Sequence, residues 1–137
     1  MTYDKIVYVR YRLEKARDAL QDARILFPAS LHGTVSRLYY ACFYAASAAL
    51  MLEGKETRRH ATVCRLFKDA FVKTGHVPVQ TGKFLPVIFD QRLKADYGDL
   101  VTFKRDMVEG WITETERFIG IVGELVEKRL SELEKRD

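Results

Sequence analysis

Residues that interrupt regular structure are scarce in this chain. It has three prolines and eight glycines in 137 residues, and neither residue type suits the interior of a helix or strand. Its two cysteines, Cys42 and Cys64, form neither a CxxC site nor a disulfide framework, so we expect reduced thiols. Few breakers favour long helices, and the chain length suits one domain over residues 1–137.

A large excess of one charge is also lacking. The formal net charge of +4 permits an acidic partner but is far below that of a dedicated DNA-binding domain. The first 18 residues carry charges throughout and lack the apolar core that a signal peptide has. The longest uncharged run, residues 38–52, is too short to span a bilayer comfortably. We therefore expect a cytoplasmic protein without membrane association.

The motifs of metal sites and of common phosphate sites are absent from the sequence. None of the three histidines, His32, His60 and His76, has a second histidine at helical spacing. There is no glycine-rich phosphate loop and no nucleophile elbow of the G-x-S-x-G type. The sequence therefore predicts neither a metal nor a cofactor.

Helical periodicity is what the sequence has instead. Apolar residues between positions 4 and 27 recur alternately every 3 and 4 residues, which is typical of an amphipathic helix that ends before Pro28. On another part of this helix, Arg10 and Arg17 flank Glu14 at spacings that favour surface ion pairs. Residues 38–52 are apolar on every side, which predicts a central helix or one covered partly by a second subunit.

Turn residues divide the rest of the chain. A polar turn is expected at residues 29–33, and Thr57 or Thr62 is expected to cap a third helix that ends at Gly75. A short helix around residues 84–91 requires Pro86 to lie in its first turn. The last helix is expected from residue 102 to 136. The predicted fold is an all-α antiparallel bundle of four long helices and one short helix.

Three polar clusters are candidate sites, and each has a plain structural alternative. Arg59 and His60 belong to a basic loop at a helix start, which favours phosphate or RNA binding or is simply solvated. Arg37 and Tyr40 could stack a base or belong to the core. In the last cluster, Asp96 could hold the guanidinium of Arg92 beside Tyr97, either in a ligand site or in a buried network.

Several segments together resemble the HEPN domain family of small bacterial and archaeal proteins. The similarity rests on SRLYYACFYAASAAL (residues 36–50), on His60 after the following loop, on FVKTGHV (residues 71–77) and on RLKADY (residues 92–97). The segments have the order and spacing of the family over nearly the whole chain. The resemblance implies a helical homodimer associated with nucleotide or RNA binding. It also implies a minimal nucleotidyltransferase as partner, often in a toxin–antitoxin pair.

The chain departs from the family at the active-site motif. The resemblance implies that toxic members are metal-independent ribonucleases. Their active site contains an arginine and a histidine a few residues further along the chain, which are brought together across the dimer. Here these positions fall on Arg92 and Tyr97. A tyrosine, with an ordinary pKa near 10, is a poor general base at neutral pH. His60 is the one candidate histidine that could substitute from another segment.

Three functions therefore stay open. The first is a non-catalytic binding module for nucleotide or RNA phosphates, with a site formed by Arg92, Asp96, Tyr97, Arg59, His60, Arg37 and Tyr40. The second is a metal-independent endoribonuclease toxin that uses Arg92 with Tyr97 or His60. The third is a purely structural helical partner. The sequence favours the first, because the catalytic histidine is missing while the scaffold motifs are present.

Overall fold

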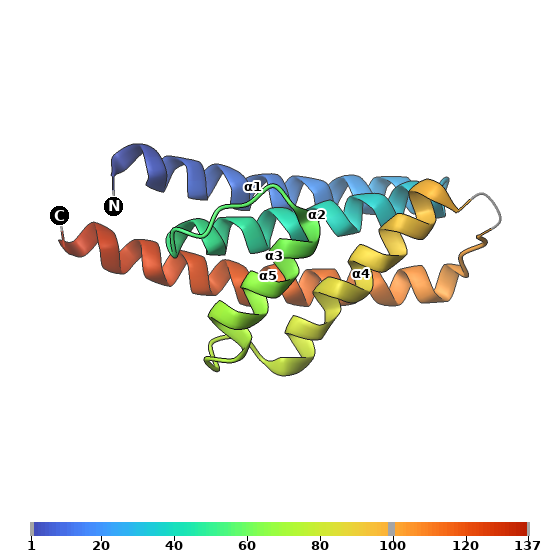
Figure 1. The fold of residues 1–137 in the computed structure, drawn as a ribbon. Coiled ribbons are helices and arrows are strands. Elements are labelled where there is room, and N and C mark those ends of the chain that lie inside the picture. The colour runs from blue at the N-terminus through green and yellow to red at the C-terminus, as the bar shows by residue number, and fades with distance from the viewer. Residues whose placement is uncertain (1, 99–100, 137) are drawn as a thin grey trace.

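The computed structural model describes residues 2–98 and 101–136. The helices, in chain order, are α1 (Tyr3–Leu26), α2 (Leu31–Leu52), α3 (His60–Phe67), a π-helical turn η1 (Lys68–Val72), α4 (Val79–Tyr97) and α5 (Arg105–Arg136) (Figure 1). Within these described ranges there is no β-strand. The predicted all-α fold is therefore confirmed.

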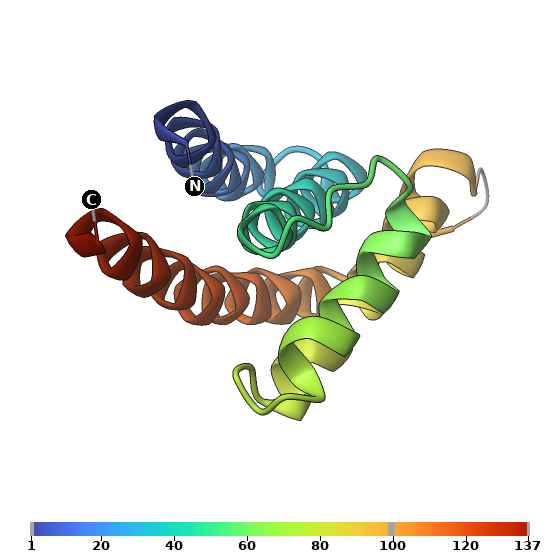
Figure 2. The same cartoon turned by 60° about the vertical axis from the view of Figure 1, so that its left-hand side comes forward.

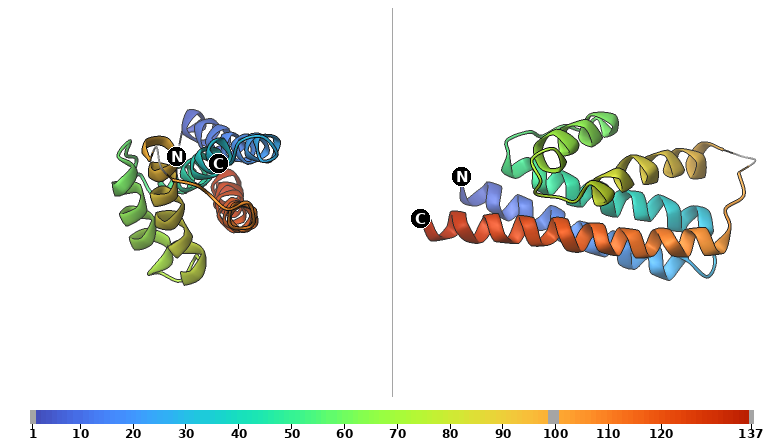
Figure 3. Two further views of the ribbon diagram at one scale, coloured as in Figure 1. Left: turned by 90° about the vertical axis from the view of Figure 1, so that its right-hand side faces the viewer. Right: turned by 90° about the horizontal axis from the view of Figure 1, so that it is seen from below.

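Helix α2 is the central element, as its apolar sequence predicted. It contacts α1, α3, α4 and α5, and the long helices α1 and α5 lie alongside it (Figures 1 and 2). Helix α1 runs antiparallel to α2 and to α5, whereas α2 and α5 run in the same direction (Figure 3). This follows because the α3–α4 hairpin returns the chain to the end of the bundle at which α2 begins.

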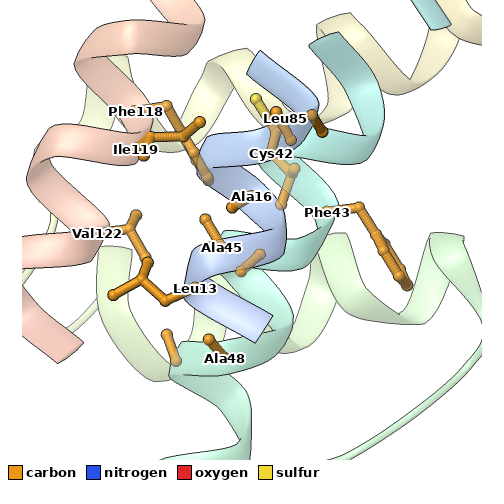
Figure 4. Packing of buried hydrophobic residues seen from close by; sticks show 14 of the residues in the cluster. Leu13, Ala16, Cys42, Phe43, Ala45, Ala48, Leu85, Phe118, Ile119 and Val122 are labelled. Atoms are coloured by element: carbon orange, nitrogen blue, oxygen red, sulfur yellow. The ribbon is translucent and has the colours of Figure 1, made fainter. Parts of the chain in front are cut away.

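The core is built on the small residues of α2. Ala45 and Ala48 face Leu13 and Ala16 of α1, and Figure 4 shows Phe118, Ile119 and Val122 of α5 closing the same cluster. Small side chains let the α1 and α2 backbones approach closely. Cys42 belongs to this core, where burial raises the pKa of its thiol to about 12.

Most of the apolar surface of α2 is buried by other helices of the same chain. Leu31–Leu52 is the one described helix that is long and apolar enough to cross a membrane, but 72% of its most apolar window is buried in the fold. A central helix in a small bundle has the same composition. The prediction that α2 is a core helix is thus confirmed.

Two predicted helix starts were wrong. The turn expected at residues 29–33 is shorter, because the Ser30 hydroxyl accepts a hydrogen bond from the Gly33 backbone N–H (3.0 Å) and α2 begins at Leu31. Neither Thr57 nor Thr62 caps α3. The hydroxyl of Thr57 instead accepts a bond from the backbone N–H of Arg59 within the loop, and α3 begins at His60.

The structure confirms four long helices and one short one, but the short helix is α3 and not the segment around Pro86. Helix α4 has 19 residues and continues through Pro86, so the expectation that this proline occupies a first turn was wrong. Pro86 is exposed, while Leu85 and Ile88 beside it are buried. Their burial offsets the hydrogen bond that the proline cannot donate.

The arginines of α1 make contacts that the sequence did not predict. Arg10 pairs with Glu134 of α5 rather than with Glu14 of its own helix, and Arg24 pairs with Glu116 of α5 at 2.6 Å. The order of these pairs along α1 and α5 fits the antiparallel arrangement of the two helices. Such exposed pairs contribute roughly 0–1 kcal/mol each, and they add specificity of register more than stability.

Candidate functional site

Arg92 links α4 to the central helix. Its Nε atom lies 2.8 Å from Oδ2 of Asp96, one helical turn further along α4, and its Nη2 donates a hydrogen bond to the Tyr40 hydroxyl at 2.9 Å. The Arg92 side chain is 15% exposed. The predicted pairing of Asp96 with Arg92 is present in the structure, and Tyr40 is an additional partner from α2. The Asp96 contact is an ion pair without hydrogen-bond geometry, since the buried Nε has no hydrogen-bond partner among the described residues, and the bond to Tyr40 is what directs Nη2.

Aromatic rings surround this guanidinium. The Arg92 Cζ atom lies 5.5 Å from the ring centroid of Tyr39 and 5.4 Å from that of Tyr40. The guanidinium of Arg37 lies 4.9 Å from the same Tyr40 ring. The ring of Tyr40 therefore contacts the guanidinium groups of both Arg37 and Arg92, and its hydroxyl accepts a hydrogen bond from Arg92. Two half-buried arginines beside one tyrosine ring, Arg37 of α2 and Arg92 of α4, form a positively charged, aromatic surface between these helices.

His60 is packed into the same aromatic cluster from the start of α3. Its ring stacks on Phe43 (centroids 4.5 Å apart, planes at 25°) and on Tyr39 (5.4 Å, 23°). Figure 4 shows Phe43 pointing away from the Leu13 and Ala45 cluster, out of the three-helix core. Nδ1 of His60 is hydrogen-bonded to the Tyr39 hydroxyl.

Protonation at this hydrogen bond follows from burial. Burial is the main cause that raises the pKa of Tyr39 far above its ordinary value, so the phenol keeps its proton. Burial, followed by the charge of Arg92, lowers the pKa of His60. A neutral imidazole therefore accepts from the Tyr39 hydroxyl at Nδ1 and carries its proton on Nε2. In this tautomer neither ring nitrogen is free to take a proton from a substrate.

Acidification is expected to destabilise the fold through His60. Because its folded pKa lies below the ordinary 6.5, the unfolded chain binds this proton more readily. The free energy of unfolding should thus decrease as the pH falls below about 6.5, with no contribution from this group above it. Urea unfolding of a His60→Gln variant should show a flatter profile in that window. His76→Gln, at an exposed residue, is the matched control, and identical profiles for wild type and His60→Gln would contradict this assignment.

The structure brings together only some of the predicted site residues. Arg92, Asp96, Tyr40, Arg37 and His60 belong to one cluster. Tyr97 is 73% exposed, and Arg59 is also exposed. Among the described residues, neither side chain makes a hydrogen bond, an ion pair or a ring contact with the cluster. Residues 92–100, whose regular pattern is expected to break at Gly98, also include Asp99 and Leu100, which lie outside the described residues.

Three cluster members were not predicted as site residues. Tyr39, Phe43 and Phe89 surround His60, with ring centroids 5.4, 4.5 and 6.1 Å from the imidazole. Tyr39 and Phe43 are four residues apart and so share a face of α2, a signal that was present in the sequence. No group of acidic, histidine and cysteine side chains suited to a metal ion is found among the residues that the structure describes.

Comparison with known proteins identifies the family of this bundle. The description "HEPN domain" applies to a family model that matches residues 9–126, which include α2, the α3–α4 hairpin and the Arg92 cluster. The chain belongs to the HEPN domain family. The resemblance inferred from the sequence is therefore confirmed.

Relatives cover most of this HEPN chain. A "UPF0332 protein" of Thermotoga maritima is 38% identical over 125 residues, which are 90% of this chain and 95% of the relative. Two proteins of Methanocaldococcus jannaschii carry the name "Putative toxin". One is 32% identical over 88% of this chain and 87% of its own length. The other is 28% identical over 77% of this chain and 76% of its own length.

Proposed function

We propose that this HEPN-family protein binds nucleotide or RNA phosphates through Arg92 and does not cleave RNA. It acts as a homodimer beside a minimal nucleotidyltransferase, in a toxin–antitoxin setting. The toxin names of two relatives support that setting. The observation that carries the proposal is the Arg92 side chain, which is 15% exposed and whose guanidinium contacts Asp96 and Tyr40.

The chemistry of the cluster suits a phosphate more than a reaction. An oriented guanidinium binds two phosphate oxygens at once, and the rings of Tyr40 and its neighbours offer faces on which a base stacks. The family resemblance assigns Tyr97 to the position of the family's histidine, and the Tyr97 side chain is exposed. Acid–base catalysis near neutral pH therefore lacks a suitable group at this position.

Binding without cleavage is the expected result for the wild-type protein. A short, fluorescently labelled single-stranded RNA should bind in an anisotropy titration, with affinity that falls as salt is added. The same RNA should stay intact on a denaturing gel in the presence of EDTA. Cleavage under these conditions would overturn the proposal, and no binding of RNA or nucleotides would leave only a structural role.

A second candidate function is a ribonuclease that uses Arg92 with His60. One observation favours it: both side chains contact Tyr39 and Tyr40, so the fold brings this histidine beside the arginine. The hydrogen bond from Tyr39 to Nδ1 opposes it, because the imidazole must exchange tautomers before it can act as a base. Cleavage by the wild type that is lost in His60→Gln would support this alternative.

The homodimer is proposed on a different surface from the one that the sequence indicated. The chain itself covers most of α2, but α1 exposes Tyr3, Val7 and Tyr11 on its outer side. Exposed aromatic groups of this kind mark protein interfaces. A specific dimer should bury roughly 1,200–2,000 Å² in total. We expect sedimentation equilibrium at micromolar concentration to give twice the chain mass, and a monomer there would contradict the dimer.

A further inference from the structure

A separate cavity lies between α1, the C-terminal half of α2 and the loop that leads to α3. Its volume is about 360 Å³, within the range of small-ligand sites. The lining residues come from all three segments: Arg12, Ser47, Leu50, Met51, Glu56, Thr57 and Arg58. None of them belongs to the Arg92 cluster. Leu50 and Met51 are buried and form an apolar part of the wall.

The two arginines of this cavity have no acidic partner in the described part of the chain, a state that they share with Arg17, Arg37, Arg59, Arg65 and Arg105. Among the described residues, neither Arg12 nor Arg58 makes an ion pair or a side-chain hydrogen bond, whereas Arg10, Arg24, Arg92, Arg117 and Arg129 each pair with an acid. Glu56 is the one carboxylate in the lining, and it is exposed. Two guanidinium groups against one carboxylate leave the cavity positively charged.

Ser47 is an independent indication of a ligand. It interrupts the alanines of α2 and is 6% exposed, and its hydroxyl oxygen is buried without a hydrogen-bond partner among the described residues. A buried hydroxyl left without a partner costs about 1–3 kcal/mol, and folded proteins rarely leave one. An oxyanion that accepts a bond from Ser47 while contacting the arginines would remove this cost.

A second hollow continues the cavity along α1. It has a volume of about 510 Å³, shares Arg12, Met51, Glu56 and Arg58 with the first, and adds Lys5 and Tyr8. Lys5 contributes a third cation, and Tyr8 is 57% exposed. Asp4 also lines this hollow, so the inner cavity with its two arginines is the more favourable place for negative charge. The combined space suits a ligand larger than one phosphate group.

We propose that this cavity is a second anion site, which holds the polyphosphate group of a small molecule on Arg12, Arg58 and the Ser47 hydroxyl. Ser47 lies seven residues after Tyr40 and so about 10 Å further along the same face of α2. The site is therefore distinct from the Arg92 cluster and does not depend on the function proposed for it. Any group attached to the polyphosphate extends into the outer hollow towards Tyr8.

Titration calorimetry of the full-length protein with inorganic tripolyphosphate tests the site. Arg12→Gln and Arg58→Gln are each expected to weaken binding about ten-fold or more, as loss of a charge-assisted hydrogen bond should. Arg10→Gln, which removes one positive charge from the same helix, should leave the affinity within about two-fold. Glu56→Gln should tighten binding, because it removes the opposing carboxylate. Unchanged affinity in both Arg12→Gln and Arg58→Gln would overturn the proposal.

Two further measurements locate the bound anion within the fold. Tripolyphosphate binding that Arg12→Gln and Arg58→Gln leave intact but Arg92→Ala removes would move the anion to the Arg92 cluster and overturn the proposal. Ser47→Ala should weaken binding several-fold while the chain stays at least as stable, since it removes an unpartnered hydroxyl. If Ser47→Ala binds as well as wild type, the assigned contact is wrong. The affinity for ATP is then compared with that for tripolyphosphate. If ATP binds more tightly and Tyr8→Ala removes this difference, the adenine base lies in the outer hollow.

Discussion

Replacing Arg92 with alanine is expected to weaken the binding of single-stranded RNA by about 10- to 150-fold. This range corresponds to a loss of about 1.5–3 kcal/mol, the typical contribution of a hydrogen bond to a charged group. The side chain is well prepared for this role, because Asp96 and Tyr40 hold its guanidinium and only 15% of it is exposed. Little conformational entropy is then lost when a phosphate binds.

The matched variant is Arg92→Lys, which keeps the charge but not the planar fork. A lysine cannot bind two phosphate oxygens while contacting Asp96 and Tyr40, so it should restore only part of the affinity. Because Arg92 also joins α4 to α2, both variants need a circular dichroism spectrum and a urea unfolding curve. A correctly folded Arg92→Ala protein with unchanged RNA affinity would show that the arginine is only a structural link between these helices.

Replacing Phe118 with alanine is expected to lower the free energy of unfolding by about 3–5 kcal/mol. The Phe118 side chain is fully buried, and its ring lies 5.5 Å from that of Phe67. It therefore holds α5 against α3 as well as against the α1–α2 pair seen in Figure 4. Removing the ring leaves a cavity where three parts of the fold meet, and the stiff helices around it can close it only partly.

Met107→Ala on the same helix is the control for this prediction. The sequence places Met107 and Phe118 on one apolar stripe of the last helix, but Met107 is 50% exposed in the structure. Its replacement should change the free energy of unfolding by no more than about 0.5 kcal/mol. Urea unfolding measures both variants. Equal losses for the two would contradict the burial of Phe118 or the exposure of Met107.

Local chemistry was sufficient to predict much of this protein. The apolar spacing of α1, the uniformly apolar run in α2 and the stop at Gly75, which has a φ of 81°, were all predictable because they depend on neighbours in the chain. The Arg92–Asp96 pair was predictable for the same reason, since residues four apart share a helix face. The family assignment rested on the order of such local segments.

The predictions that were wrong concern features that depend on contacts between distant segments. Pro86 remains inside α4 because buried neighbours offset its missing hydrogen bond, and Arg10 turns to Glu134 of α5 instead of Glu14. Tyr39 is buried in the core, and it also holds His60 and faces Arg92, contacts that no local pattern predicts.

The sequence by itself thus determined which segments are helical, which faces are apolar and which family the chain resembles, because backbone propensity and side-chain period act over a few residues. Only the tertiary structure decided which polar groups of distant segments meet. His60 lies beside the Tyr39–Tyr40–Arg92 cluster, and Arg12 lines the same cavity as Arg58. These placements depend on how the α3–α4 hairpin and the loop before it cross α2, and that crossing is set by packing over the whole chain.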